Sequence, residues 1–150
     1  MMDTSFTRVW NRVKASGPVD DSAVLKGFIR DELRDAADYS GLIRKTGAPR
    51  VRKLLASLAA DERRHARKLQ AADYMQYGRS SIPSENQKSG DERILSALRR
   101  RYTLELEAAE SYRTAAETAA NETLKGLYGE LSEEERKHAD ALCALLEQML

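Results

Sequence analysis

Four long segments of the chain place apolar residues at the three- and four-residue spacing of an amphipathic α-helix. The first covers about residues 21 to 45, and the second begins at Pro49, which suits a first helical turn, and stops at Gly78. The third covers about residues 91 to 119, and the fourth follows Asn121, whose side chain can cap a helix N-terminus. The pattern therefore predicts an all-α protein.

The second and fourth segments each carry a glutamate and a histidine inside the apolar stripe. Glu62 with His65 and Glu135 with His138 form two Glu-x-x-His phrases, which contain both histidines of the chain. Residues three apart lie on one helix face, so each phrase directs a carboxylate and an imidazole to the same place. The apolar and aromatic positions expected to face inward are Leu25, Phe28, Ile29, Leu33, Ala36, Tyr39, Ile43, Val51, Leu54, Leu55, Leu58, Ala66, Leu69, Ile94, Leu95, Leu98, Tyr102, Leu106, Ala109, Tyr112, Ala116, Leu124, Leu127, Leu131, Leu142, Leu145 and Met149.

The two halves of the chain form an internal sequence repeat. When the first half is aligned on the second without a gap, its Glu-x-x-His phrase coincides with that of the second half. Matches in Glu, Tyr and His are harder to obtain by chance than matches in leucine, so the repeat predicts two equivalent helical hairpins. The matched polar pairs are Glu32 with Glu105, Tyr39 with Tyr112, Glu62 with Glu135, and His65 with His138.

The spacing inside each hairpin sets the height of these residues. Gly47, at the predicted turn, lies midway between Glu32 and Glu62 in the sequence, and the second hairpin repeats this separation with Glu105 and Glu135. Residues equidistant from the turn lie at one level, about 22 Å from it at about 1.5 Å per residue. Each hairpin is therefore predicted to place a glutamate opposite a Glu-x-x-His phrase.

The segment from 78 to 90 has coil composition and no period, so it is interpreted as a connection. Two to eight residues suffice between adjacent bundle helices, whereas about thirteen extended residues can cross roughly 45 Å. We therefore predict a four-helix bundle of two hairpins joined by a long crossover, as in ferritin-like folds. The bundle would span residues 20–150, preceded in 1–19 by a short amphipathic helix.

The composition of the chain limits the kinds of partner and binding site that can be expected. Charged residues make up 33% of the chain, yet the formal net charge is only +1, which gives no reason to expect nucleic acid or a membrane surface. No apolar run has the length of a membrane span, and the start lacks the features of a secretory signal. Cys143 is the only cysteine, so neither an internal disulfide nor a thiolate metal site is expected. We expect a soluble, cytoplasmic protein.

The predicted core would contain four carboxylates and two imidazoles. Without metal, the buried carboxylates would repel each other and lose several kcal/mol each in hydration, or take up protons. Oxygen-rich ligation with one imidazole per metal suits two iron or manganese ions better than a structural zinc. Tyr39 and Tyr112 lie where each phenol can hydrogen-bond a carboxylate of the facing hairpin. The predicted metal ligands are Glu32, Glu62, His65, Glu105, Glu135 and His138.

Other polar residues of the helices lack this combination of repeat and matched height. Tyr102 and Tyr128 are interpreted as core or rim aromatics, because the repeat pairs them with Ile29 and Leu55. The acids interpreted as solvated helix faces are Asp35, Asp61, Glu107, Glu110, Glu133 and Glu134.

Two longer phrases carry a family resemblance. Glu32-Leu-Arg-Asp-Ala-Ala-Asp-Tyr39 and Glu105-Leu-Glu-Ala-Ala-Glu-Ser-Tyr112 are each followed, at the same separation, by Glu-Arg-(Arg/Lys)-His-Ala. Over about residues 22 to 150 the chain resembles the rubrerythrin branch of the ferritin-like superfamily. The resemblance implies a homodimer with a di-iron centre that reacts with peroxide or dioxygen, held by the six ligands above. Bacterioferritins are similar too, but their haem-binding methionine has no clear equivalent here.

Two departures bear on the implied activity. Full-length rubrerythrins carry a rubredoxin-like domain with four cysteines that supplies electrons, so this chain would need an external electron donor protein, such as a rubredoxin-like one. Rubrerythrins also often carry another glutamate three residues after the third-helix ligand, where this chain has Ala108.

The leading hypothesis is a rubrerythrin-type di-iron oxidoreductase that reduces hydrogen peroxide or oxidises Fe(II), with Tyr39 and Tyr112 orienting the metal ligands. One alternative is iron sequestration, as a ferritin-like cage subunit or as cargo in a protein shell. Another is a di-manganese, catalase-like protein, and a third is a metal-free helical interaction module. The sequence leaves open the native metal, the oxidant, the electron donor and the oligomeric state.

Overall fold

The computed structural model describes residues 20–80 and 90–150, which form four long helices and their turns. They are α2 (Asp21–Ile43), α3 (Pro49–Tyr77), α4 (Ile94–Thr118) and α5 (Glu122–Met149). The short helix predicted within residues 1–19 lies outside the described residues, so the division of the chain at residue 20 stays a prediction. None of the described helices is long and apolar enough to span a membrane.

Local sequence signals set several helix boundaries, and those at Pro49, Gly78 and Asn121 were predicted. The side chain of Asp20 accepts hydrogen bonds from the backbone amides of Ser22 and Ala23 at the start of α2. Pro49 occupies the first turn of α3, and Gly78 ends that helix in the left-handed conformation at φ 67°, which glycine adopts without strain. The side chain of Asn121 caps α5 by accepting from the amide of Leu124.

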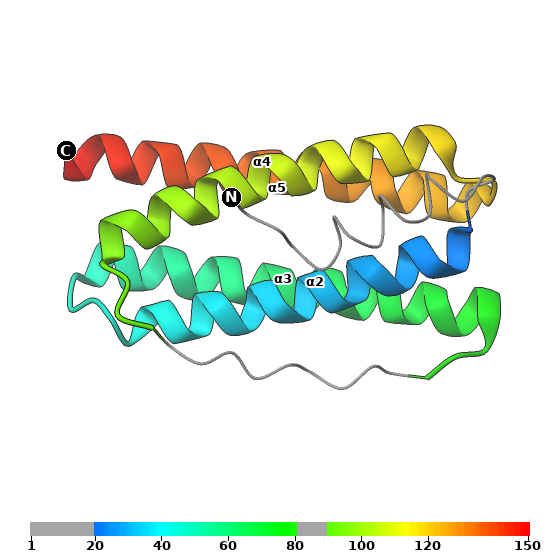
Figure 1. Cartoon of the computed structure of the whole chain (residues 1–150), viewed down its shortest axis with the longest axis horizontal. Helices are drawn as coiled ribbons and strands as arrows, with labels where there is room; N and C mark the ends of the chain where they lie inside the picture. Colours follow the sequence, from blue (N-terminus) through cyan, green and yellow to red (C-terminus); the bar gives the residue numbers. More distant parts are fainter. Residues whose placement is uncertain (1–19, 81–89) are drawn as a thin grey trace.

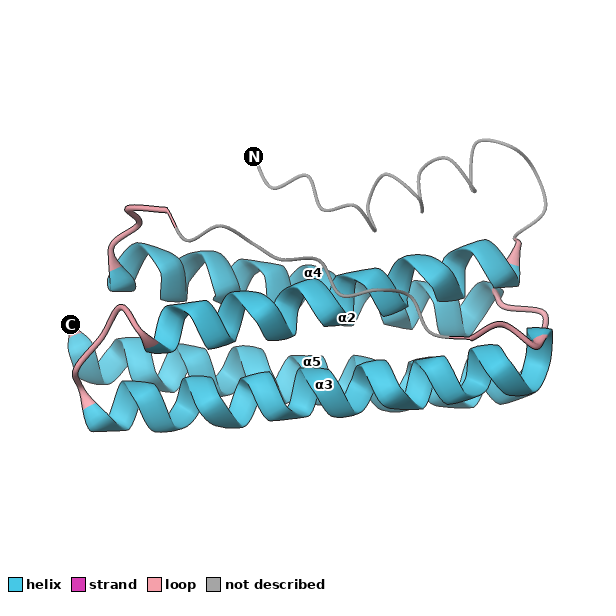
Figure 2. Cartoon of the chain, turned by 90° about the horizontal axis from the view of Figure 1, so that it is seen from below, coloured by secondary structure: helices cyan, strands magenta, loops and turns pink. Residues whose placement is uncertain are grey.

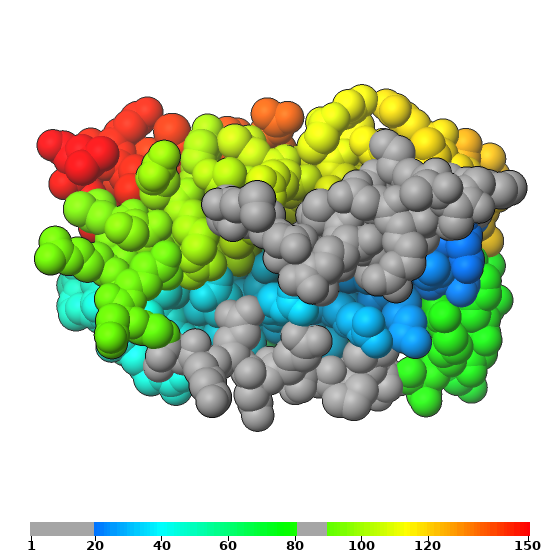
Figure 3. Space-filling model, viewed as in Figure 1, coloured from blue at the N-terminus to red at the C-terminus, as the bar shows by residue number. Residues whose placement is uncertain are grey.

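The helices run side by side as two hairpins, α2 with α3 and α4 with α5 (Figures 1 and 2). The end of α3 and the start of α4 lie at opposite ends of the bundle, so the chain crosses its whole length between them (Figure 1). This confirms the predicted all-α four-helix bundle with one long crossover. Each hairpin packs tightly within itself, while α2 against α4 and α3 against α5 make fewer contacts. The space-filling view shows the face along which α4 lies against α2 (Figure 3).

Polar contacts tie the helix ends together at both ends of the bundle. At one end, the carboxylate of Asp21 accepts from the amides of Ala120 and Asn121 at 3.1 and 3.0 Å, and Asn121 also donates to Gln76 at 2.8 Å. At the other end, Arg50 of α3 donates to Gln148 of α5 at 2.5 Å. These contacts fix the register of one hairpin against the other.

The core consists of two apolar clusters separated by a polar layer. One cluster includes Leu25, Leu69 and Leu131, and the other includes Leu42, Leu55 and Leu142. Between the clusters, every helix contributes buried polar residues at mid-length, whereas the buried Asp73 lies near the end of α3 and pairs with Arg79. The polar layer is made of Glu32, Glu62, His65, Arg101, Glu105, Glu135 and His138.

The predicted inward face of α4 was partly wrong. Leu95 is 40% exposed, and Leu106 and Ala116 are only partly buried, whereas Ala97, Arg101, Glu105 and Ala115 are buried. Helix α4 turns the face that carries Glu105 toward the centre, and this rotates the leucines on either side of that face outward.

We predict that Leu69→Ala lowers the free energy of unfolding by about 2–5 kcal/mol, because Leu69 is fully buried and its loss leaves a cavity. Leu95→Ala is the matched control, since this leucine is 40% exposed. It should change the free energy by about 0.5 kcal/mol or less. Urea unfolding of the metal-stripped protein measures both, and equal losses would contradict the assignment of the core.

Candidate metal centre

The six predicted ligands lie together in the polar layer, and none of their residues is more than 6% exposed. Their donor atoms form two overlapping groups in which all atoms lie within 4.8 Å of one another. Position A consists of Glu32, Glu62, His65 and Glu135, and position B consists of Glu62, Glu105, Glu135 and His138. Each group supplies three carboxylates and one imidazole, so the layer can hold two metal ions with Glu62 and Glu135 shared between them.

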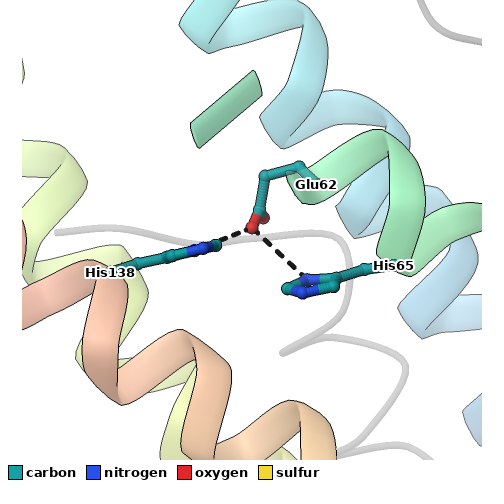
Figure 4. Close-up of side chains that lie close together, drawn as sticks. All are labelled: Glu62, His65 and His138. Carbon is teal, nitrogen blue, oxygen red and sulfur yellow. Dashed lines mark ion pairs between the residues drawn. The ribbon is translucent and has the colours of Figure 1, made fainter. Parts of the chain in front are cut away.

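Glu62 lies between the two histidines, one from α3 and one from α5 (Figure 4). Its Oε1 atom is 3.0 Å from Nδ1 of His138 and 3.5 Å from Nδ1 of His65. Glu135 contacts the same two nitrogens, at 2.9 Å from His65 and 3.5 Å from His138. The imidazole rings are nearly parallel, with centroids 5.6 Å apart. Both histidines therefore direct Nδ1 toward the shared carboxylates.

The outward nitrogens of the histidines each meet a carboxylate of the other hairpin. Nε2 of His138 on α5 lies 3.0 Å from Asp61 on α3, and Nε2 of His65 on α3 contacts Glu134 on α5. An imidazole that donates its outer N–H to a carboxylate is held in one orientation and is more basic toward a metal at its other nitrogen. Asp61 and Glu134, which were interpreted as solvated acids, therefore each contact a predicted ligand, although the side chain of Asp61 is 37% exposed.

The two tyrosines make the contacts predicted for them. The phenol of Tyr39 on α2 donates to Oε1 of Glu105 on α4 at 2.5 Å, and that of Tyr112 on α4 donates to Oε1 of Glu32 on α2 at 2.6 Å. Burial raises the pKa of both phenols well above the ordinary range, so they stay protonated as donors. Each hairpin thus orients a predicted ligand of the other.

Arg101 is a member of the layer that the sequence did not reveal. Its guanidinium donates to Glu105 at 3.1 Å and to Asp35 at 3.0 Å, and it lies 4.3 Å from the ring centroid of Tyr39. Asp35 is consequently the partner of a buried cation, so its interpretation as a solvated acid was wrong. Glu107, Glu110 and Glu133 are exposed or only partly buried, as predicted.

Burial and mutual repulsion divide the protons unevenly among the carboxylates. Burial, together with the charge of Glu62, raises the pKa of Glu32 to about 8, and burial with the charge of Glu105 raises the pKa of Glu135 well above its usual range. Burial opposes ionisation of Glu62 as well, but the close contacts of its carboxylate with His138 and His65 hold the pKa of Glu62 below its usual range. The protein thus keeps two of the four ligand carboxyls neutral when no metal balances them.

The other ligands are charged in that state. The pKa of Glu105 is lowered, because contacts with Glu135, His138 and Arg101 outweigh burial and the charge of Glu62. Burial alone would lower the pKa of His65 and His138, but the surrounding carboxylates raise both well above the ordinary range. Two imidazolium ions then balance Glu62 and Glu105.

The unpaired atoms of the layer fit metal ions. Several buried atoms have no hydrogen-bond partner of good geometry within the described residues, and most of them are carboxylate oxygens of the predicted ligands. Oxygen-rich donor sets with imidazole match iron or manganese. The unpaired ligand atoms are Glu32 Oε2, both oxygens of Glu62, Glu105 Oε2, Glu135 Oε2 and His138 Nδ1.

A cavity of about 80 Å³ opens between α2 and α4 beside this layer. Glu32 and Tyr112 lie at its inner side, and Asp35, Arg101 and Ala108 also line it. A space of this size takes a few molecules as small as water.

Two comparisons show what the chain is similar to. The family model described as Rubrerythrin matches residues 96–150. A solved structure of a hypothetical protein from Pyrococcus furiosus is similar, with a TM-score of 0.74 and 24% identity over 85% of this chain and 89% of that one. Identity at this level shows a shared fold. No curated protein matches the chain significantly.

The sequence therefore located all six predicted ligands and both tyrosines, while their roles as ligands and ligand partners stay a prediction. It missed Asp61 and Glu134, although the internal repeat pairs them and each directly precedes a shared glutamate. It missed Arg101 because the repeat pairs that residue with Phe28, so no symmetry marked it.

We predict that metal binding near pH 7 releases protons, up to about four for two ions, because Glu32, Glu135 and both histidines hold protons in the metal-free layer. The apparent affinity for Mn(II) should consequently rise as the pH increases through the Glu32 pKa of about 8. A pH-stat titration measures the release, and Glu32→Gln should release fewer protons than the native chain. Binding without proton release would contradict this distribution of charge.

We predict that Glu134→Gln weakens metal binding by about tenfold or more, because the amide cannot balance the imidazole of His65 as a carboxylate does. Glu133→Gln is the matched control, since the neighbouring Glu133 is exposed. Competition against a metal indicator measures both affinities. Equal effects of the two substitutions would show that Glu134 contributes no more than a surface charge.

Proposed function

We propose that this chain is a di-iron oxidoreductase that reduces hydrogen peroxide or oxidises Fe(II) with dioxygen, and the match of residues 96–150 to the Rubrerythrin family model supports the proposal. The observation that carries the proposal is the pair of overlapping four-residue groups, whose unpaired carboxylate oxygens face one another inside an apolar bundle. Bound iron would supply the electrons for reduction of the oxidant.

The residues of the chain divide the work of such a centre. Positions A and B would hold the two ions, with Glu62 and Glu135 setting the distance between them. Tyr39 and Tyr112 hold the carboxylates of Glu105 and Glu32 in place, so that less reorganisation is needed when charge changes at the metals.

The apolar clusters on both sides of the layer keep bulk water away from it. The cavity beside Glu32 supports a small oxidant as the second reactant, because its volume of about 80 Å³ suits peroxide or dioxygen. Water exclusion strengthens each electrostatic contact within the layer and limits side reactions of the reduced metal.

A separate electron donor protein is part of the proposal. The 150 residues contain one cysteine, Cys143, so no four-cysteine iron site lies within them. The homodimer and the cytoplasmic location expected from the sequence stay predictions.

We predict that the metal-stripped chain binds two Fe(II) ions under anaerobic conditions, because the layer offers two groups of four donors. One addition of peroxide should then produce the near-ultraviolet absorption of Fe(III) within the time of mixing. Iron analysis together with stopped-flow spectroscopy measures both quantities. Manganese bound in preference to iron from a mixture of the two metals would favour the manganese alternative.

The matched test uses two double variants. Glu62→Ala with Glu135→Ala removes both shared carboxylates and should abolish binding of the pair of ions. Glu110→Ala with Glu133→Ala changes the net charge by the same amount on exposed surfaces and should bind two ions. A Glu62→Ala, Glu135→Ala chain that still binds two irons would overturn the proposal.

A further inference from the structure

The internal repeat is broken at one buried position beside the metal centre. The repeat pairs Arg101 on α4 with Phe28 on α2, so a cation stands on one side of the layer where an uncharged ring stands on the other. Both residues pack on a tyrosine: Arg101 lies 4.3 Å from the ring centroid of Tyr39, and Phe28 stacks on Tyr112 with centroids 4.0 Å apart. The two tyrosines therefore make equivalent hydrogen bonds to glutamates, but one packs against a charged side chain and the other against an uncharged one.

Arg101 acts directly on the carboxylate of position B. Its Nη2 atom donates to Oε1 of Glu105 at 3.1 Å, and that same oxygen accepts from the phenol of Tyr39 at 2.5 Å. A carboxylate oxygen has two lone pairs in the plane of the group, and both are then in use. Glu105 is left with Oε2 as its one oxygen free to bind a metal, and Oε2 has no hydrogen-bond partner in the described residues.

Glu32 at position A has more lone pairs available to bind a metal ion than Glu105 has at position B. Its Oε1 accepts from Tyr112 at 2.6 Å, and its Oε2 has no hydrogen-bond partner in the described parts of the chain. One lone pair on Oε1 and both on Oε2 are consequently available, which permits this carboxylate to bind an ion through both oxygens. Phe28, at the place of Arg101, is uncharged, and Arg34, which lines the same cavity as Glu32, lies 3.8 Å from the carboxylate of Asp31.

The other terminal nitrogen of Arg101 faces two aspartates. Nη1 contacts Asp35 at 3.0 Å and Asp38 at 3.1 Å, while Nη2 is the atom that faces Glu105. Arg101 is 1% exposed, so water does little to screen its charge from an ion bound to Glu105. The neighbouring Arg100 shares Asp38 with it, but its recorded contacts are with Asp38 and Glu92 and not with Glu105.

We propose that Arg101 makes the two metal positions unequal, so that position A fills first and position B binds the second ion more weakly. The inference rests on the proposed di-metal function and adds an order of loading to it. A guanidinium bound to Glu105 withdraws one oxygen from the second ion and repels its charge, and both effects act at position B.

The test is a titration of the metal-stripped full chain with Mn(II), followed by electron paramagnetic resonance. It is done without oxygen and at one fixed pH for every variant, so that competition from protons is the same throughout. One equivalent should give the six-line signal of isolated Mn(II), and the second equivalent should convert it to the signal of a coupled pair. The two dissociation constants should differ by about tenfold or more.

Substitutions show which metal position each of the two binding steps belongs to. Arg101→Gln should tighten the second step by about tenfold and leave the first within about threefold, while Arg100→Gln, a charge loss in the same network, should change neither step. Circular dichroism and thermal melting report whether Arg101→Gln folds. If it does not, the order of filling still tests the inference, because Glu105→Gln should spare the first step and Glu32→Gln should weaken it.

The outcomes separate this inference from the proposed function. A chain that binds no Mn(II) and no Fe(II) overturns both. A native chain that shows the coupled signal already at one equivalent, or loses its first step with Glu105→Gln, still supports a di-metal centre but overturns the inequality. An Arg101→Gln chain that folds and keeps the native ratio of affinities overturns the role of Arg101.

Discussion

Electrical neutrality of a layer buried at mid-bundle is the constraint on which this structure depends. Four carboxylates and two imidazoles lie between two apolar clusters, where a charged group without an opposite charge or a hydrogen-bond partner is costly. The protein meets the constraint in two ways: protons on Glu32, Glu135 and the histidines balance the layer without metal, and two divalent ions in place of those protons balance it with metal. The same groups therefore serve stability in one state and metal binding in the other.

The side chains that hold the polar layer in place come mostly from the opposite hairpin. Apart from the contact of Arg101 with Glu105, the contacts that orient the predicted ligands from outside cross between hairpins, as with Tyr39 and Glu105 or Asp61 and His138. Between the hairpins, the backbones of α2 and α4 and of α3 and α5 make fewer close contacts than the two helices of one hairpin do. The polar layer joins the two hairpins at mid-length, between two apolar clusters to which both hairpins contribute.

Most of the fold and of the polar layer could be predicted from the sequence, because the helical spacing of apolar residues and the internal repeat are both visible in the residue types. The Glu-x-x-His phrases, with a glutamate at matched height in each hairpin, were enough to place six buried groups at one level. What could not be predicted is what depends on helix rotation. Leu95 and Arg101 lie on one helix, and the apolar pattern alone favoured the leucine, whereas the ion pairs with Asp35 and Asp38 bury the arginine.

The crossing of the tyrosine and histidine contacts between hairpins has an evolutionary consequence. A protein of half this length would hold no complete site alone, but two copies related by a two-fold axis would reproduce every tyrosine, histidine and glutamate contact seen here. Two copies of one hairpin must carry the same residue at both equivalent positions. One chain that contains both hairpins is free of that rule, and it is this freedom that allows Phe28 on one side of the layer and Arg101 on the other.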